Sequence, residues 1–332
     1  MTQPPASAFS LVADIGGTNT RVALTCGDQL LANSTQRYQN ANYPDLETVL
    51  NRYLTEQGRV DIMGACIAVA GPVRNGVATM TNLGWNIDKR VLSRAVGSEN
   101  VSIVNDLQAQ GHALGRLDAK SLRSITKSTP QALNATRLVI GIGTGFNCAP
   151  VFETQAGRFV PPAEAGHMTI PAFACNDSDL MQFVETADGV LAVDDILSGR
   201  GLEHIHRCLS AHKGIPSELS AAEIMAEVSG GLNESVEASM LLFVRILGIV
   251  IGDLALIHLP FGGIYLVGGV ANAVAPYLER FKFRNSMADK GRFAEFMASF
   301  PVTVIEDDYA ALIGCAYHLA DQKKARSATL SR

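Results

Sequence analysis

The sequence lacks any run of basic residues long enough to follow a nucleic-acid backbone. Its 332 residues include 27 Lys and Arg against 32 Asp and Glu, which gives a formal net charge of -5. Charged residues make up only 18% of the chain. Because binding to nucleic acid depends on clustered positive charge, this balance argues against DNA or RNA as a partner.

The sequence also lacks the features of a secreted or membrane-spanning protein. Its first residues, MTQPPASAFS, have no basic segment followed by an apolar one, so they predict a short tail and not a signal peptide. The most apolar stretch, residues 240–259, is interrupted by Arg245 and Asp253 and falls short of the roughly 20 apolar residues that a spanning helix needs. We therefore expect a buried helix there, no membrane partner and a cytoplasmic protein.

The six cysteines lack the spacing of a disulfide framework or a zinc site. No Cys-x-x-Cys pair occurs, and Cys175 follows His167 by eight residues with no second cysteine beside it. A structural zinc ion needs four ligands. The pattern predicts reduced, mostly buried thiols and no zinc site.

The sequence does contain a large apolar fraction, much of it arranged as short strands. Hydrophobic residues make up 47% of the chain, enough for the cores of two domains of ordinary size. Residues 10–25 and 137–152 share one design, in which a glycine-rich turn joins two apolar strands, and each predicts a β-hairpin. A third apolar strand ends in Gly268-Gly269 and leads into a helical pattern. The repeated design predicts an α/β fold with an internal duplication.

The turn of the first hairpin, Asp14-Ile-Gly-Gly-Thr-Asn-Thr-Arg21, suits a phosphate group. Gly16 and Gly17 allow a sharp turn that brings backbone N–H groups up to an anion, and the two polar residues after them add side-chain donors. Asp14, at the end of the strand, is placed to hold Mg²⁺ directly or through water. A plain hairpin with an Asn/Gly turn is the alternative.

The second glycine-rich turn, Gly141-Ile-Gly-Thr-Gly145, is weaker evidence alone and gains its meaning from the first. It does not match G-x-G-x-x-G, and no G-x-x-x-x-G-K-[ST] occurs, so neither the dinucleotide fingerprint nor the P-loop is present. The two hairpins together predict a nucleotide whose phosphates they grip from both sides. Gly268-Gly269 offers close backbone approach to an adenine or ribose, and a strand-to-helix turn explains these glycines almost as well.

Asn105-Asp106 ends a predicted buried strand, just before a segment of helical character. Ligands of α/β proteins bind at the carboxyl ends of strands, so Asp106 is placed to accept a proton from an attacking sugar hydroxyl. The alternative is structural, because the same aspartate would also serve as the N-cap of the following helix.

The segment Pro162-Ala-Glu-Ala-Gly-His167 carries a carboxylate and an imidazole three residues apart. Glu164 and His167 suit hydrogen bonds to a polyhydroxylated ligand, and a surface turn is the alternative. Trp85, the only tryptophan, either joins the core or lines a sugar cleft. The other histidines are predicted to be exposed and without a role: His112, His204, His206, His212, His258 and His318.

Taken in order, these segments resemble the bacterial glucokinase family, sugar kinases of the actin, hexokinase and Hsp70 superfamily. The resemblance covers about Ser10 to Leu319 and rests on ADIGGTNTR, TNLGWNID, IVNDLQAQGHAL, GIGTGF, EAGH, ILSGRGL and GGIYLVGGV. The related kinase and repressor group with a zinc motif is less similar. Its members would show several cysteines after the EAGH-like histidine, and its repressors an N-terminal helix-turn-helix.

The resemblance implies that Asp106 is the general base and that Asn105, Asp106, Glu164 and His167 contact the glucose. The family has a further acidic sugar ligand, normally a glutamate, four residues before the serine of the LSG motif. Here that position is Asp194, whose carboxylate is one methylene shorter and reaches the sugar only if the backbone lies closer. The residues implied to bind ATP are Ala13, Asp14, Ile15, Gly16, Gly17, Thr18, Asn19, Gly143, Thr144, Gly145, Gly268 and Gly269.

The fold implied is α/β, a two-domain actin-like ATPase (ribonuclease H-like) fold with a duplicated core and an interdomain cleft. We expect a small domain of residues 1–112, completed by the C-terminal helix 309–332, and a large domain of residues 113–308. The activity implied is phosphorylation of glucose at O6 by ATP and Mg²⁺, carried out by a cytoplasmic homodimer. A kinase for another hexose, such as mannose or fructose, is one alternative, and a non-enzymatic actin- or Hsp70-like ATP-driven interaction protein is another.

Overall fold

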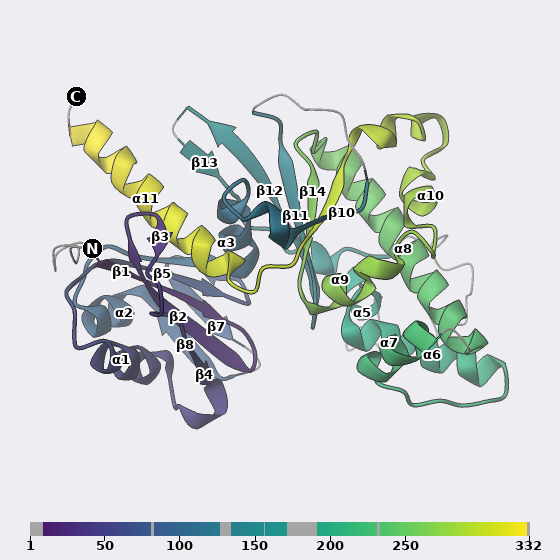
Figure 1. The fold of residues 1–332 in the computed structure, drawn as a ribbon, viewed down its shortest axis with the longest axis horizontal. Helices are drawn as coiled ribbons and strands as arrows, with labels where there is room; N and C mark the ends of the chain where they lie inside the picture. Colours follow the sequence, from purple (N-terminus) through teal and green to yellow (C-terminus); the bar gives the residue numbers. More distant parts are fainter. Residues whose placement is uncertain are drawn as a thin grey trace. The chain divides into compact units, whose positions relative to one another are not determined.

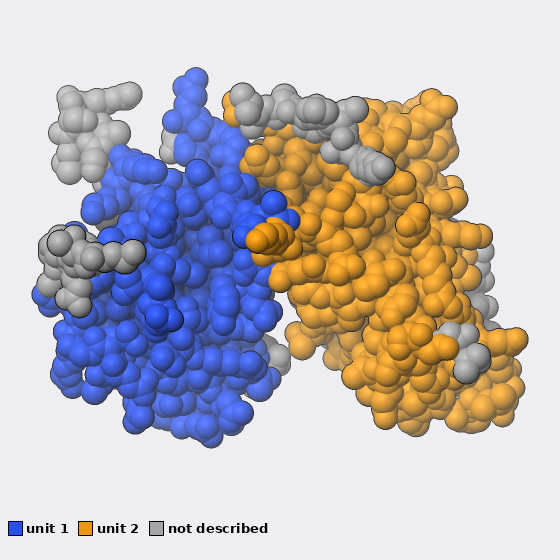
Figure 2. All heavy atoms as spheres, in the orientation of Figure 1, with its two compact units in different colours: residues 1–119, 153–162, 307–332 blue, residues 120–152, 163–306 orange. Residues whose placement is uncertain are grey.

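The chain forms two compact units (Figure 2). The computed structural model describes residues 9–80, 83–126, 134–155, 157–170, 191–230 and 233–330, with the backbone alone for 326–330. Unit 1 contains residues 1–119, 153–162 and 307–332, and unit 2 contains residues 120–152 and 163–306. The predicted domains, divided at residues 112 and 308, placed residues 153–162 in the large domain, whereas the structure groups them with unit 1.

The main sheet of unit 1 begins with the predicted glycine-tipped hairpin (Figure 1). Strands β1 (Phe9–Ile15) and β2 (Asn19–Cys26) pair antiparallel. Strand β5 (Ile62–Val69) then pairs parallel to β1, and β9 (Val101–Asn105) pairs parallel to β5. The order is β3-β2-β1-β5-β9, with β4 also on β2. The short strands of the unit are β3 (Gln29–Leu30), β4 (Gln36–Gln39) and a separate three-stranded sheet of β6 (Val73–Arg74), β7 (Val77–Met80) and β8 (Trp85–Asp88).

Both faces of this sheet are covered, because alternate residues of a strand point to opposite faces. Leu11, Ala13 and Ile15 join one buried cluster and Val12 joins another. The first cluster includes residues of α1 (Leu46–Glu56) and α2 (Lys89–Val96), and the second includes residues of α3 (Asp106–Ala113) and α11 (Ala310–Leu330). Helices α3 and α11 cross closely, since a Cβ at Gly314 would overlap the carbonyl oxygen of Ala109.

The sheet of unit 2 repeats the same plan. Strands β11 (Arg137–Ile142) and β12 (Phe146–Thr154) form the second glycine-tipped hairpin. Strand β14 (Ile264–Val267) pairs parallel to β11, and β15 (Val302–Ile305) pairs parallel to β14. The order of the sheet, β10-β15-β14-β11-β12-β13, adds β10 (Leu122–Ser124) and β13 (Gly157–Phe159) at the ends. Strand β13 belongs to the segment 153–162, which is grouped with unit 1. A hairpin followed by two parallel strands therefore occurs twice, as the predicted duplication requires.

Helix α8 (Glu234–His258) is the longest helix of unit 2 and contains the predicted buried stretch. Its length and composition would suit a membrane span, but 67% of its apolar window is buried inside the protein. It is a core helix of this unit. The other α-helices in the described part of the unit are α5 (Val193–Ile196), α6 (Gly199–His212), α7 (Ala221–Gly230), α9 (Gly269–Val274) and α10 (Phe283–Ala288). The described residues also form the 3₁₀ helices η2 (Asn40–Asn42), η3 (Ala119–Ser121), η4 (Ala165–His167), η6 (Ala275–Tyr277), η7 (Gly291–Phe293) and η8 (Phe296–Ser299).

Trp85, His112 and His206 lie inside the protein. Trp85 is 5% exposed in the core of unit 1, which favours the core over the sugar cleft for this residue. His112 and His206 are buried, so the prediction that they are exposed is wrong. Their ring nitrogens lie near partners distant in sequence, 3.1 Å from His318 for His112 and 3.0 Å from Ser239 for His206. Both ring nitrogens of His206 have partners, whereas Nδ1 of His112 has none among the described residues. Local sequence does not reveal such distant partners.

Candidate active site

The tip of the first hairpin is held from behind by a buried asparagine. Gly16 closes the turn through its N–H, which donates to the carbonyl of Asn19 at 3.0 Å. Asn40, only 2% exposed, donates from Nδ2 to the carbonyl of Gly16 at 2.8 Å and accepts from the hydroxyl of Thr20 at 2.8 Å. On its outer side the tip is open, since a Cβ at Gly17 would have no neighbour within 4 Å. The exposed backbone of this turn can therefore approach an anion, as predicted.

Asp14 is the last residue but one of β1 and pairs with Arg21 of β2. Its Oδ2 lies 3.3 Å from Nη1 of Arg21. Burial raises the pKa of the Asp14 carboxyl, and the charge of Arg21 opposes that rise. A nearby cation would favour the ionised form, and Mg²⁺ commonly binds one or two carboxylates together with substrate phosphates. The carboxylate and the adjacent open turn fit a magnesium–phosphate complex.

Asn105, not Asp106, is the N-cap of α3. The side chain of Asn105 accepts from the N–H of Leu107 at 2.9 Å, and Gln108 completes a capping box by accepting from the Asn105 N–H at 3.0 Å. Asp106 is the first residue of the helix and is half-buried, with Oδ1 accepting from the same Leu107 N–H at 2.8 Å. The capping alternative for Asp106 therefore loses its main support.

The far end of α3 is braced by Arg158, a residue that the sequence analysis missed. Nη1 of Arg158 donates to three carbonyls at the end of the helix, those of Gly111, His112 and Leu114, at 2.7 to 3.1 Å. A cation at a helix C-terminus satisfies carbonyls that have no partner within the helix. The brace fixes the axis of the helix that begins with Asp106.

The edge of the unit 1 sheet brings the predicted residues of this unit together. Ile15 pairs with Val69 on the next parallel strand, and Val69 pairs with Asn105 on the one after it. The first hairpin tip and the Asn105-Asp106 pair therefore follow strand ends in register at the same edge. In open α/β sheets this edge is where ligands bind.

The tip of the second hairpin is held by different groups. The N–H of Gly143 donates to the carbonyl of Gly145 at 2.9 Å, and the N–H of Gly199 donates to the carbonyl of Gly143 at 3.0 Å. Asp194, in α5, accepts from the N–H of Phe146 through Oδ1. Gly268, at the end of the neighbouring strand, has φ +103°, and its Cβ would lie 2.5 Å from the carbonyl oxygen of Ile142. Glycine is required there by close packing.

The predicted sugar-binding turn is anchored to this hairpin by Asn147. Nδ2 of Asn147 donates to the carbonyl of Ala163 at 2.6 Å, and its Oδ1 accepts from the N–H of Ala165 at 2.9 Å. Glu164 and His167 remain exposed on the turn, with the His167 N–H donating to the Glu164 carbonyl at 3.2 Å. An amide within an otherwise apolar strand, FNCAPVF, was the available sequence signal for Asn147.

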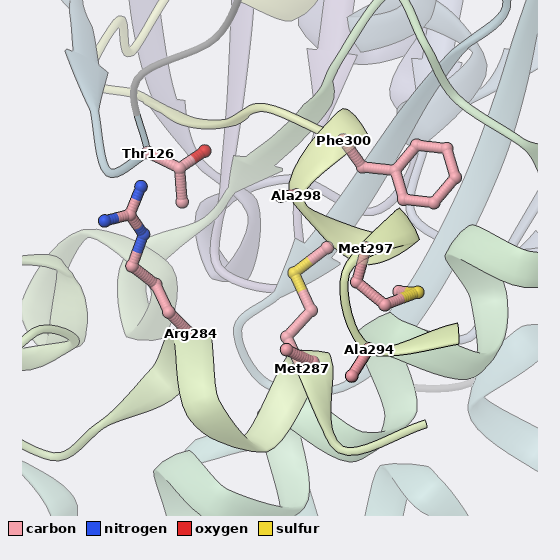
Figure 3. Close-up of a pocket in the computed structure, with 8 residues that line it drawn as sticks. Thr126, Arg284, Met287, Ala294, Met297, Ala298 and Phe300 are labelled. Atoms are coloured by element: carbon pink, nitrogen blue, oxygen red, sulfur yellow. The ribbon is translucent and has the colours of Figure 1, made fainter. Parts of the chain in front are cut away.

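A pocket of about 180 Å³ in unit 2 lies apart from these residues (Figure 3). It is lined by Thr126, Arg284, Met287, Ala288, Ala294, Met297, Ala298 and Phe300, which include no predicted site residue. Within the described part of the chain, no three His, Cys, Asp or Glu side chains group to hold a metal ion. Cys175, considered above for zinc, lies outside the described residues.

Comparisons with known proteins agree with the resemblance. Residues 11–322 match the sequence model of the glucokinase family. A glucokinase of Mesorhizobium japonicum is 31% identical over 307 residues, which cover 92% of this chain and 90% of that protein. The crystal structure of a glucokinase from an Antarctic psychrotroph, 30% identical, superposes with a TM-score of 0.82 over 94% of this chain and 98% of the other. A ROK family glucokinase of Streptomyces griseus in complex with glucose and AMPPNP has the same fold, with 20% identity, a TM-score of 0.62 and coverage of 95% of this chain and 99% of the other.

Proposed function

The chain belongs to the glucokinase family, and we propose that the residues described above carry out the family reaction, transfer of the γ-phosphoryl group of ATP to O6 of glucose. The single observation that carries this assignment is the edge of the unit 1 sheet. There a glycine-tipped turn open to phosphate and the carboxylate of Asp106 follow strand ends that are in register. A phosphate-binding turn beside a carboxylate is what a kinase needs for its donor and for the acceptor hydroxyl.

Asp106 acts as the general base. Its carboxylate accepts the proton of the glucose 6-hydroxyl as O6 forms a bond to the γ-phosphorus. The bond from that phosphorus to the β,γ-bridging oxygen breaks, and ADP leaves. The capping box and the Arg158 brace hold α3 in place, so Asp106 meets the hydroxyl in a fixed orientation, which is how positioning lowers the barrier.

Backbone N–H groups of the two hairpin tips bind the phosphates of ATP. Asp14 would hold Mg²⁺ directly or through water, and the ion would supply charge neutralisation for the phosphates when bound. Burial raises the pKa of the Asp14 carboxyl, and a cation beside it would lower that pKa and favour the ionised form that binds the ion. The adenosine lies against Gly268-Gly269.

Asn105, Glu164 and His167 bind glucose hydroxyls. Glu164 and His167 are exposed on a turn whose backbone Asn147 fixes, so their side chains are accessible to a ligand while their positions are set. Oε2 of Glu164 also accepts from Nδ2 of Asn147 at 3.5 Å. Oδ1 of Asp194 accepts from the N–H of Phe146, and Oδ2 is its second acceptor oxygen.

A coupled assay of ADP formation across glucose, mannose and fructose tests the assignment. We expect glucose to give the highest kcat/KM. A higher value for mannose or fructose would replace glucose by that hexose and leave the kinase assignment intact. Absence of ADP formation with every hexose would overturn the proposed function.

Two further proposals rest on the family resemblance: the protein acts in the cytoplasm, and it is a homodimer. Light scattering coupled to size-exclusion chromatography should give a mass of twice the 35.3 kDa chain. A mass of one chain across micromolar concentrations would contradict the dimer and leave the kinase assignment unaffected.

A further inference from the structure

Asp194 contacts the second hairpin by its side chain. It lies in the short helix α5, and its Oδ1 accepts a hydrogen bond from the N–H of Phe146, the first residue of β12. The two residues are 48 positions apart in sequence. A bond between a carboxylate and a backbone N–H is roughly twice as strong as one between neutral groups.

The carboxylate lies between two glycines of the site. A Cβ at Gly145 would be 2.5 Å from Oδ1 of Asp194, and a Cβ at Gly166 would be 3.2 Å from the same oxygen. Gly145 belongs to the proposed phosphate-binding tip, and Gly166 belongs to the turn that carries Glu164 and His167. One oxygen of Asp194 is therefore adjacent to both segments.

The backbone on either side of Asp194 is tied to the same two segments. The N–H of Val193 donates to the carbonyl of Met168, just after the sugar-binding turn, at 2.9 Å. The N–H of Gly199 donates to the carbonyl of Gly143, in the hairpin tip, at 3.0 Å. These bonds fix the backbone position of Asp194. From that position its short side chain reaches the N–H of Phe146.

We propose that Asp194 is a positioning residue that holds the Gly143–Gly145 tip and the Glu164–His167 turn in fixed relation to each other. This role rests on the proposed function, which assigns phosphate to the first segment and sugar to the second. The family resemblance predicts a sugar ligand at this position. In this chain the carboxylate is one methylene shorter than the family's glutamate, and the oxygen nearest the two glycines is engaged by the backbone.

Three variants separate the positioning role from a direct sugar ligand. Asp194→Ala removes the acceptor, so we expect KM to rise about 10- to 100-fold for both glucose and ATP, the loss expected for one charge-assisted hydrogen bond. Asp194→Asn keeps an oxygen that can accept from Phe146, and both KM values should stay within about fivefold of the wild type. Asp195→Asn is the matched control, because Asp195 is the next residue of α5 and contacts Arg200 and the N–H of Ala192 instead of Phe146. Asparagine keeps an oxygen that can accept from Ala192.

Amide hydrogen exchange at Phe146 provides a readout independent of activity. Exchange should be faster in Asp194→Ala and close to the wild type in Asp194→Asn and Asp195→Asn. If Asp194→Asn raises KM for glucose as much as Asp194→Ala while KM for ATP and exchange at Phe146 are unchanged, Asp194 is a sugar ligand and the proposal fails. Wild-type kinetics in Asp194→Ala would overturn it as well.

Two further results distinguish failure of this proposal from failure of the proposed function. If Asp194→Ala does not fold, Asp194→Asn decides alone: near wild-type KM values support positioning, and a loss confined to glucose overturns it. If the wild-type protein phosphorylates no hexose, the proposed function fails, whereas the exchange measurement still reports whether Asp194 holds the hairpin.

Discussion

The two glycine-tipped hairpins share a strand plan and differ in what holds their tips. Each is followed by two parallel strands, in the orders β2-β1-β5-β9 and β12-β11-β14-β15. The first tip is held by the neutral amide of Asn40, which is almost fully buried. The second is held by the half-buried carboxylate of Asp194 and by the backbone of Gly199.

The two tips are held differently because different segments of the chain lie next to them. Asn40 binds the first tip from behind with a neutral amide and leaves Gly17 open, so the turn can offer N–H groups to a phosphate. Asp194 binds the second tip where it meets the Glu164–His167 turn. In the proposed function, the first tip therefore meets phosphate alone, whereas the second tip lies beside the turn proposed to bind the sugar.

The largest expected effect is the loss of kcat on substitution of Asp106, the proposed general base in unit 1. Asp106→Asn should lower kcat by about 10²–10⁴, the usual loss when a general base is removed. The melting temperature should stay near that of the wild type, because Asn105 supplies the cap of α3. Turnover and thermal melting are to be measured on the same preparation. A variant that melts normally with near wild-type kcat would show that Asp106 is not the base.

Substitutions in the turn of unit 2 should affect binding of the sugar and not the chemical step. Glu164→Gln or His167→Ala should each raise KM for glucose with little change for ATP. The loss of one hydrogen bond to a charged or polar group costs roughly 1–3 kcal/mol. Steady-state kinetics with each substrate varied in turn measures this. Unchanged glucose kinetics in both variants would return the segment to a plain surface turn.

Removal of the neutral clamp should weaken the first hairpin only. Asn40→Ala leaves the carbonyl of Gly16 and the hydroxyl of Thr20 without their partner, so we expect the free energy of unfolding to fall by about 1–3 kcal/mol and KM for ATP to rise. Asn42→Ala, two residues away and exposed, is the control. Equal effects from the two substitutions, measured by denaturant titration and ATP kinetics, would contradict the clamp.

The last effect concerns the acid stability of unit 1. Burial lowers the pKa of His112 from 6.5 to about 3, with the charges of His318 and Arg158 acting in the same direction. Between about pH 6.5 and 3 the unfolded chain binds a proton at this ring that the folded chain does not. The free energy of unfolding therefore falls as pH drops through that window, by at most about 1.4 kcal/mol per pH unit for this ring.

His112→Gln should flatten this dependence, and substitution of the exposed His212 to Gln should not. Denaturant titrations from pH 7 to 5 compare the slopes of the three proteins. The same slope in wild type and His112→Gln would rule out His112 as its source.

Local patterns in the sequence were enough to predict the two hairpins, the buried strands after them and the Asp106 and EAGH motifs. Their signals are short-range: glycines in a turn, apolar residues in a run, and a polar residue at a strand end. Pairing of β1 with β2 and of β11 with β12 confirms both hairpins.

Only the tertiary structure decided which side chains hold these motifs in place. Asn40 lies 24 residues from Gly16, Arg158 lies 44 from Leu114, and the Asp194 carboxylate lies 48 from Phe146. A hydrogen bond needs its donor and acceptor within about 3 Å, and for residues so far apart only the packed sheets and helices set that distance. The return of residues 153–162 to unit 1 has the same cause, because contacts with distant segments, not the local pattern, assign those residues to a unit.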